Sequence, residues 1–359
     1  MDAGDAREGA RAPHWEGTDV GLVRLGQLYD RLFVDDEWAV RGEREFTWWM
    51  AELPQRVRAG EPAWREGHDG PPVEWAWIEA ETVVATDVDP EEAIGIAIGF
   101  NAVATQSAWI VDPVRRELVV SLRLPTDATD EERLVLLRTA VALQAAEAVR
   151  IGRAWEGKVA SRPHPVSGER AEPDRLIAVP DALRSNETDG SLVPGAFRAV
   201  AELGREDGLW VLATDDPAGL TAEIPWSGAT PAHRSERHLR TALFRLRTDE
   251  PHPLIGKGLL AVLELPTVLP VAEAVRLANA LNLAERALTL RVAGLGAWRI
   301  RPVSATRASL AWSCFTPAVE ILRLPNPDDL LYLASLAYDA RNRTAWAHYQ
   351  LERLAGTGS

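Results

Sequence analysis

The sequence is poor in the residues that most often indicate a disulfide framework, a metal site or a membrane span. It contains one cysteine, Cys314, so no disulfide can form within the chain and no cysteine-based zinc site is possible. Cys314 lies in an apolar stretch, where we expect a buried, inert thiol. No apolar run approaches the length of a membrane span, and the polar N-terminus has no apolar signal core. We therefore expect a cytoplasmic protein without membrane contact.

Lysine is also scarce, because Lys158 and Lys257 are the only two in the chain. The formal net charge is -14, and the arginines form no basic run. An acidic chain of this kind is repelled by phosphate backbones, so we expect no nucleic-acid partner.

Residues arranged for catalysis or metal binding are equally hard to find. His233 and His238 are five positions apart, which suits neither one helix face nor one strand face for shared ligation. The chain has no Gly-x-Ser-x-Gly segment, and residues 256–258 (GKG) lack the other parts of a phosphate-binding loop. The sequence therefore predicts no enzyme, no cofactor and no metal site.

What the chain does contain is a well-patterned stretch over residues 74–124. Residues 74–84 alternate as a strand, with Trp75, Trp77 and Glu79 on one face. Pro90, in a position that the first turn of a helix tolerates, precedes apolar residues at helical spacing. The elements expected after the first strand are a helix over residues 93–104 and strands over residues 107–112 and 118–124.

The flanking segments complete a domain over residues 18–151. They are predicted as a helix over residues 20–33, two short strands within residues 38–64 that break or bend near residue 53, and a helix over residues 130–151. Asp19 and Thr129 are good N-caps for the two helices. The resulting order, α-β-β-β-α-β-β-α, predicts an α+β domain with an antiparallel sheet and helices packed on it.

The same order returns in the second half of the chain. The expected divisions are a disordered tail over residues 1–17, a first domain over 18–151, a proline-rich linker over 152–191 and a second domain over 192–354. From the middle helix onward Asn101, Trp109, Pro113 and Ser121 are matched by Asn282, Trp298, Pro302 and Ser313. We expect two tandem copies of one domain, with Trp109 and Trp298 buried in corresponding strands.

Two short segments carry a resemblance to a known superfamily. Residues 46–49 (FTWW), followed by residues 55–57 (QRV), resemble the start of TY-Chap domains, which are YbjN-like and related to type III secretion chaperones. The second copy lacks this segment and has residues 222–226 (AEIPW) in that region. The resemblance implies a bacterial, chaperone-like or adaptor role, in which sheet and helix surfaces bind a partner without catalysis.

Tryptophan is the one unusual residue type, with 14 in the chain. The candidates for partner binding are clustered in the first strands: Trp48, Trp49, Trp64, Trp75 and Trp77. They can instead fill the core between sheet and helices. Because Trp48 and Trp49 are adjacent in a strand, they point to opposite faces, so only one of them can face the helix layer.

The two copies are expected to pack on one another within one chain. A linker of roughly forty residues lets them meet, and the raised effective concentration favours a mostly monomeric pseudo-dimer, although a homodimer is possible. The expected contact is the long final helix of each copy or the sheet face bearing Trp48 or Trp49, with a shared sheet-lined surface left for a protein or peptide partner. The alternative is a structural or regulatory pseudo-dimer without a client.

Overall fold

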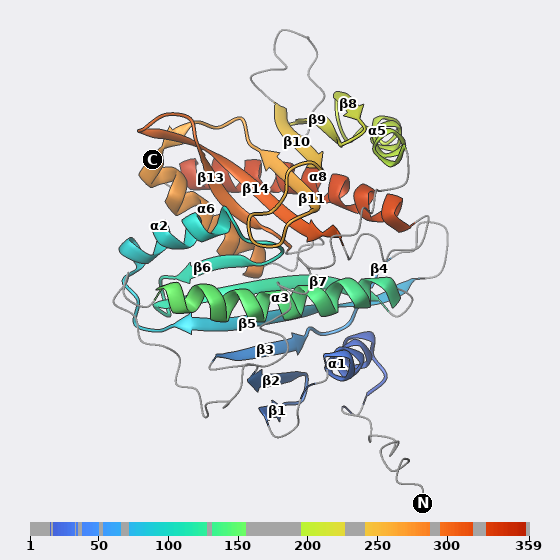
Figure 1. Ribbon diagram of the computed structural model, residues 1–359, viewed down its shortest axis with the longest axis vertical. Coiled ribbons are helices and arrows are strands. Elements are labelled where there is room, and N and C mark those ends of the chain that lie inside the picture. Colours follow the sequence, from blue (N-terminus) through green and yellow to red (C-terminus); the bar gives the residue numbers. More distant parts are fainter. Residues whose placement is uncertain are drawn as a thin grey trace, which may run out of the picture.

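The computed structural model (Figure 1) describes residues 15, 17–32, 34, 38–49, 53–65, 72–127, 131–155, 195–226, 241–287, 295–318 and 328–356. Within these residues each half of the chain forms a seven-stranded antiparallel sheet with helices packed on it. The α+β class and the tandem arrangement predicted from the sequence are therefore confirmed.

The first half is built on the sheet order β1-β2-β3-β5-β7-β6, with β4 pairing with β5 beside β3. Its elements are α1 (Val20–Arg31), β1 (Ala39–Arg41), β2 (Glu45–Trp49), β3 (Pro54–Ala59), β4 (Ala63–Arg65), β5 (Val73–Ala85), α2 (Pro90–Asn101), β6 (Ala108–Asp112), β7 (Glu117–Asp127) and α3 (Glu131–Trp155).

The second half repeats this order as β8-β9-β10-β11-β14-β13. The short β12 also pairs with β14, on the same side as β11. Its elements are α5 (Ala196–Glu206), β8 (Leu212–Asp216), β9 (Gly219–Pro225), β10 (Thr241–Arg247), β11 (Gly258–Glu264), β12 (Leu269–Pro270), α6 (Val271–Ala287), β13 (Ala297–Pro302), β14 (Arg307–Pro317) and α8 (Asp328–Gly356).

Local sequence signals account for several element boundaries. The Asp19 side chain accepts a hydrogen bond from Leu22 N at 3.1 Å and caps α1, as predicted. Asp89 caps α2 in the same way, and Pro90 follows it in the first turn. Thr129, the predicted cap of α3, lies outside the described residues.

Two expected boundaries are wrong at their edges. Trp15, assigned to a disordered tail, is buried against Tyr29 and Phe46, and its Nε1 donates to Gly42 O at 3.0 Å. Gly152, assigned to the start of the linker, lies inside α3. A Cβ at Gly152 would approach Val84 to 2.9 Å, so this glycine allows α3 to pack closely on β5. The rest of the tail, apart from Gly17, and residues 156–191 lie outside the described residues.

The two halves meet through their middle helices and edge strands, which are α2 and β6 in one half and α6 and β13 in the other. In β6, Trp109 N donates to Asn101 Oδ1 at 2.7 Å, and Asn101 Nδ2 donates to Trp109 O at 2.9 Å. Asn282 binds the backbone of Trp298 in β13 in the same way, at 2.8 and 2.9 Å. The matched asparagines thus bind the matched tryptophans.

Side-chain amides also cross between the halves. Asn101 Nδ2 lies 3.3 Å from Trp298 O, so this carbonyl receives a donor from each half. Asn279 of α6 accepts from Val111 N and donates to Val111 O, both at 2.9 Å. The backbone groups at the free edge of β6 are therefore hydrogen-bonded by one asparagine side chain from each half. The contact is made by the middle helices rather than by the final helix of each copy, and α6 also reaches the sheet face that bears Trp49.

The halves face in opposite directions. Figure 1 shows α3 in front of β5 and β7, but α8 behind β13 and β14. We call the face of each sheet that points away from its own α3 or α8 its outer face. The middle helix α6 reaches the outer face of the first sheet, where Leu283 packs on Ala108 and Ile110. The expected single surface shared by both sheets is therefore not formed.

The loop over residues 102–107 is bound by both halves. His252 Nε2 lies 2.9 Å from Val103 O, and Phe315 N donates to Thr105 O at 2.9 Å. From the first half, Glu147 accepts hydrogen bonds from Thr105 and Ser107, and burial raises the pKa of this carboxyl. The loop is therefore part of the junction between the halves.

Replacing Trp298 with alanine should lower the free energy of unfolding by about 3–5 kcal/mol, since Trp298 is fully buried and its truncation leaves a cavity. Its Nε1 also donates to Glu285 Oε1 at 2.7 Å, and that half-buried acceptor would lose a donor. Urea unfolding followed by circular dichroism measures the change. Trp64→Ala is the matched control, because Trp64 is 68% exposed and should cost less than about 0.5 kcal/mol. Equal losses in the two variants would contradict the packing described.

His252 should make the stability depend on pH. Burial lowers the pKa of His252, although its bond to Val103 O acts in the opposite direction. Its Nδ1 already accepts from Leu254 N and Ile255 N, so protonation would break both bonds. A lowered folded-state pKa means that stability is present above the ordinary pKa of about 6.5 and falls as the pH drops below it.

The measurement is the free energy of unfolding of the wild type minus that of His252→Gln. This difference should shrink as the pH falls from neutral toward 5, by at most about 1.4 kcal/mol per pH unit. A difference that stays constant over this range would show that His252 is not the titrating group.

Candidate functional site

The five candidate tryptophans do not form one surface. Trp48 is 2% exposed in the core, and its Nε1 donates to Gln55 Oε1 at 2.6 Å. Trp49 is half-buried on the opposite face of β2, as the alternation predicts. Trp64 is the exposed member, and it pairs with Glu74, which places it on the helix side of the sheet.

Trp75 and Trp77 lie on the outer face of the first sheet. Their rings meet edge to face with centroids 5.2 Å apart, and the Arg123 guanidinium lies 4.5 Å above the Trp77 ring. Trp77 is buried and Trp75 half-buried. Trp49 lies on the same face, but the register places it near the Thr82 end of β5, away from Trp75 and Trp77.

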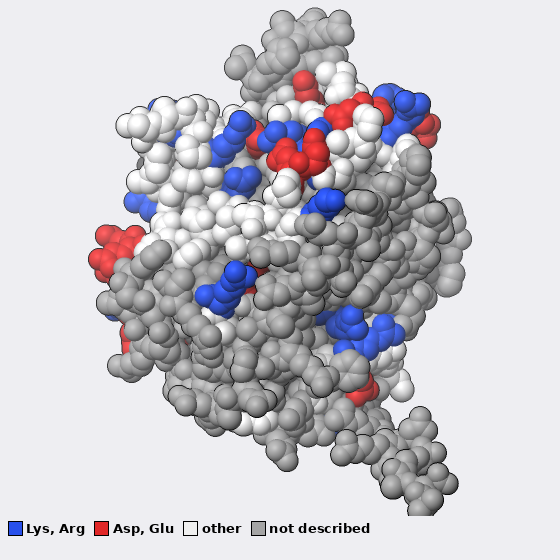
Figure 2. Space-filling model, viewed as in Figure 1, with Lys and Arg blue, Asp and Glu red and all other residues white. Residues whose placement is uncertain are grey.

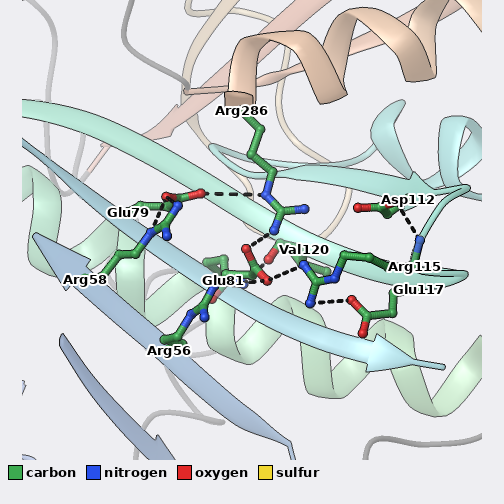
Figure 3. Close-up of polar contacts among 10 residues, drawn as sticks. Arg56, Arg58, Glu79, Glu81, Asp112, Arg115, Glu117, Val120 and Arg286 are labelled. Atoms are coloured by element: carbon green, nitrogen blue, oxygen red, sulfur yellow. Dashed lines mark hydrogen bonds and ion pairs between the residues drawn. The ribbon is translucent and has the colours of Figure 1, made fainter. Parts of the chain in front are cut away.

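Two buried carboxylates follow Trp75 and Trp77 along β5 on the same face of the sheet. Glu79 and Glu81 are each only 4% exposed. Arg58 Nε donates to Glu79 at 2.7 Å, and Arg56 lies 3.7 Å from Glu81, both from the neighbouring strand β3. Arg115, from the turn before β7, lies 3.8 Å from Glu81 (Figure 3).

Arg286 covers these carboxylates from the second half of the chain. It projects from the last turn of α6, contacts Glu81 directly and lies 3.6 Å from Glu79. Its own carbonyl accepts a hydrogen bond from Arg123 Nη1 at 3.2 Å. The charge cluster of Glu79, Glu81 and Arg286 therefore joins the two halves and closes this part of the first outer face.

The outer face of the second sheet has a different chemistry. Arg245 contacts Glu264 at 2.5 Å, Arg301 contacts the same carboxylate, and Arg299 donates from Nε to Ser313 Oγ at 2.9 Å. The strand pairings place these side chains on one face, with the buried Ala311 among them. Figure 2 shows isolated basic side chains on a largely uncharged surface over β13 and β14.

The lengths of the two middle helices explain why the outer faces differ. The helix α2 ends at Asn101, whereas α6 continues past the matched Asn282 to Ala287. Only the longer helix carries a residue in the place of Arg286. The second outer face thus has no counterpart of that arginine from α2.

Features of a metal site or a membrane span were sought in the part of the chain that the structure describes. It holds no group of three or more His, Cys, Asp or Glu side chains placed to bind a metal ion. None of its helices combines the length and apolar character needed to cross a membrane. Cys314 is buried, as predicted.

Comparison of the chain with models of known protein families, with curated proteins and with solved structures gave no match in any of the three. The two outer faces therefore have to be interpreted from their own residues.

Sequence reasoning found part of the first face and missed the second. The alternation over residues 74–84 placed Trp75, Trp77 and Glu79 together. It did not find Arg286, which comes from the other half. Arg299 and Arg301 were within a predicted strand, and their spacing of two positions was the available signal that they share a face.

Replacing Arg286 with alanine should lower the free energy of unfolding by about 1–3 kcal/mol, because Glu79 and Glu81 stay buried and lose a charged partner. Arg276→Ala is the control on the same helix, since Arg276 is exposed and should cost less than about 0.5 kcal/mol. Chemical denaturation at low and high salt measures both. A loss no larger than that of Arg276→Ala would mean that the cluster does not hold the halves together.

Proposed function

We propose that the protein is a non-enzymatic, chaperone-like or adaptor protein that binds a partner protein or peptide. The observation that carries the proposal is the difference between the two outer faces. One is closed by Arg286 over a buried charge cluster, while the other presents arginine side chains beside the half-buried Leu243. A sheet face of mixed apolar and charged character is a form of surface used for protein recognition.

The buried acidic groups support binding over catalysis. Glu79 and Glu81 are ion-paired, and Glu147 is held by three donors from Thr105 and Ser107. Each carboxylate thus has a role in holding the fold. We accordingly propose a function without turnover, cofactor or metal, in a reducing cytoplasm where Cys314 stays a thiol.

A second candidate is a structural or regulatory pseudo-dimer that has no client. The extensive polar junction favours it, since Asn279 and Arg286 join the halves at β6 and β5. In this alternative the arginine-bearing outer face of the second sheet has no ligand.

An affinity purification of the full chain from its native host separates the two candidates. The binding function predicts one protein recovered in stoichiometric amount, whose purified form rebinds the purified chain at micromolar concentration or tighter. The control bait is the same chain heat-unfolded and immobilised at equal density. Repeated recovery of no such protein would favour the pseudo-dimer without a client.

A further inference from the structure

Three arginines lie on the outer face of the second sheet, and one carboxylate contacts two of them. Arg245 of β10 and Arg301 of β13 both contact Glu264. Arg299 donates only to Ser313 Oγ within the described part of the chain, and its terminal nitrogens contact no acidic group there. The three arginines thus outnumber the carboxylate that contacts them, although the whole chain carries a net charge of -14 and Glu223 of β9 lies on the same face beside Leu243.

The surroundings of Arg299 destabilise the charged form of its side chain. Burial lowers the pKa of Arg299, and the nearby Arg245 and Arg301 lower it further. Glu264 and Glu250 raise it, but neither contacts Arg299. A half-buried guanidinium with incomplete compensation is a group that an added anion would stabilise.

The spacing of the arginines indicates an extended ligand. Arg299 and Arg301 are two positions apart on one strand, so their side chains leave the sheet about 7 Å apart on the same face. Arg245 stands three strands away from β13, a distance of about 14 Å across the sheet. One small anion cannot span these positions, whereas alternate residues of an extended peptide repeat at the spacing of Arg299 and Arg301.

We propose that Arg245, Arg299 and Arg301 form a docking face for an extended acidic segment of the partner, with carboxylates at alternate positions. This rests on the binding function proposed above and adds the chemistry of the partner. The terminal nitrogens of Arg299 have no acidic partner in the described part of the chain and can donate to a carboxylate, and Arg301, 55% exposed on its side chain, can turn from Glu264 to a second one.

The surroundings favour an acidic peptide over a nucleic acid. Arg247, the next outward residue of β10, is already paired with Asp216 and Asp249 at 2.7 and 2.5 Å. These carboxylates end the basic face on that side. A phosphate backbone is charged along its whole length and would meet them, but a short acidic segment would not.

The test measures binding of a labelled peptide of alternating Glu and Ser to the full chain by fluorescence anisotropy. The wild type should bind it, more weakly at high salt, and should bind the Gln–Ser and Lys–Ser peptides at least about tenfold more weakly. Arg299→Ala with Arg301→Ala should weaken Glu–Ser binding by about tenfold or more. Arg205→Ala with Arg276→Ala, which removes the same charge from exposed positions on α5 and α6, should change it by less than about twofold.

A charge-reversal variant distinguishes loss of the docking face from loss of folding. Arg299→Glu with Arg301→Glu should bind the Lys–Ser peptide better than the Glu–Ser peptide, while its unfolding midpoint stays near that of the wild type. The proposal is overturned if the wild type binds no acidic peptide, if both double alanine variants lose binding equally, or if single-stranded DNA binds through the same arginines more tightly than the peptide.

The host partner separates this proposal from the function on which it rests. A partner that binds the wild type and the Arg299/Arg301 alanine variant equally well would leave the adaptor function standing and refute this docking face. Recovery of no partner by the wild type would refute the adaptor function itself.

Discussion

The unpaired backbone groups of an edge strand are the constraint on which this arrangement depends. An open edge offers N–H and C=O groups that must find partners once they leave water. In β6 these groups belong to Trp109 and Val111, and asparagine amides bind both, from Asn101 in the same half and Asn279 in the other. An amide suits this task because it donates and accepts at once. The positions of α2 and α6 between the sheets follow from it.

Once the middle helices are placed, their differences decide what each sheet presents. Asn279 stands three positions before Asn282, and the residue three positions before Asn101 is Ile98, which is buried and cannot form the same pair of hydrogen bonds. The continuation of α6 brings Arg286 over Glu79 and Glu81, whereas α2 ends before the matching point. A repeated fold thus contains one sheet face closed by an arginine of the other half and one sheet face that lacks such an arginine.

Much of the fold could be predicted from local patterns. Alternation predicted β5, Asp19 caps α1 as predicted, Pro90 stands in the first turn of α2, and the adjacent Trp48 and Trp49 face opposite ways. Local patterns failed where a residue serves a distant neighbour. Gly152 looks like a helix end but allows close packing on Val84, and Trp15 looks like part of a polar tail but packs on Phe46.

The candidate site was harder to predict for the same physical reason. The face of Trp75 and Trp77 is completed by Arg286, which is 205 positions from Glu81 in sequence. Periodicity within one segment shows which residues share a face, but it cannot show which face another segment will cover. The opposite orientation of the sheets was also hidden, since it arises from the contacts between the two copies rather than from either copy alone.

Asn279 and Ile98 occupy matched positions in the two copies. A symmetric homodimer could not have different residues at these two positions. There, any substitution appears at both equivalent positions, so one helix would have to suit its own edge strand and its partner's with a single set of side chains. Carrying both copies in one chain removes that restriction. Each middle helix can specialise, and a change that opens one sheet face leaves the other face closed.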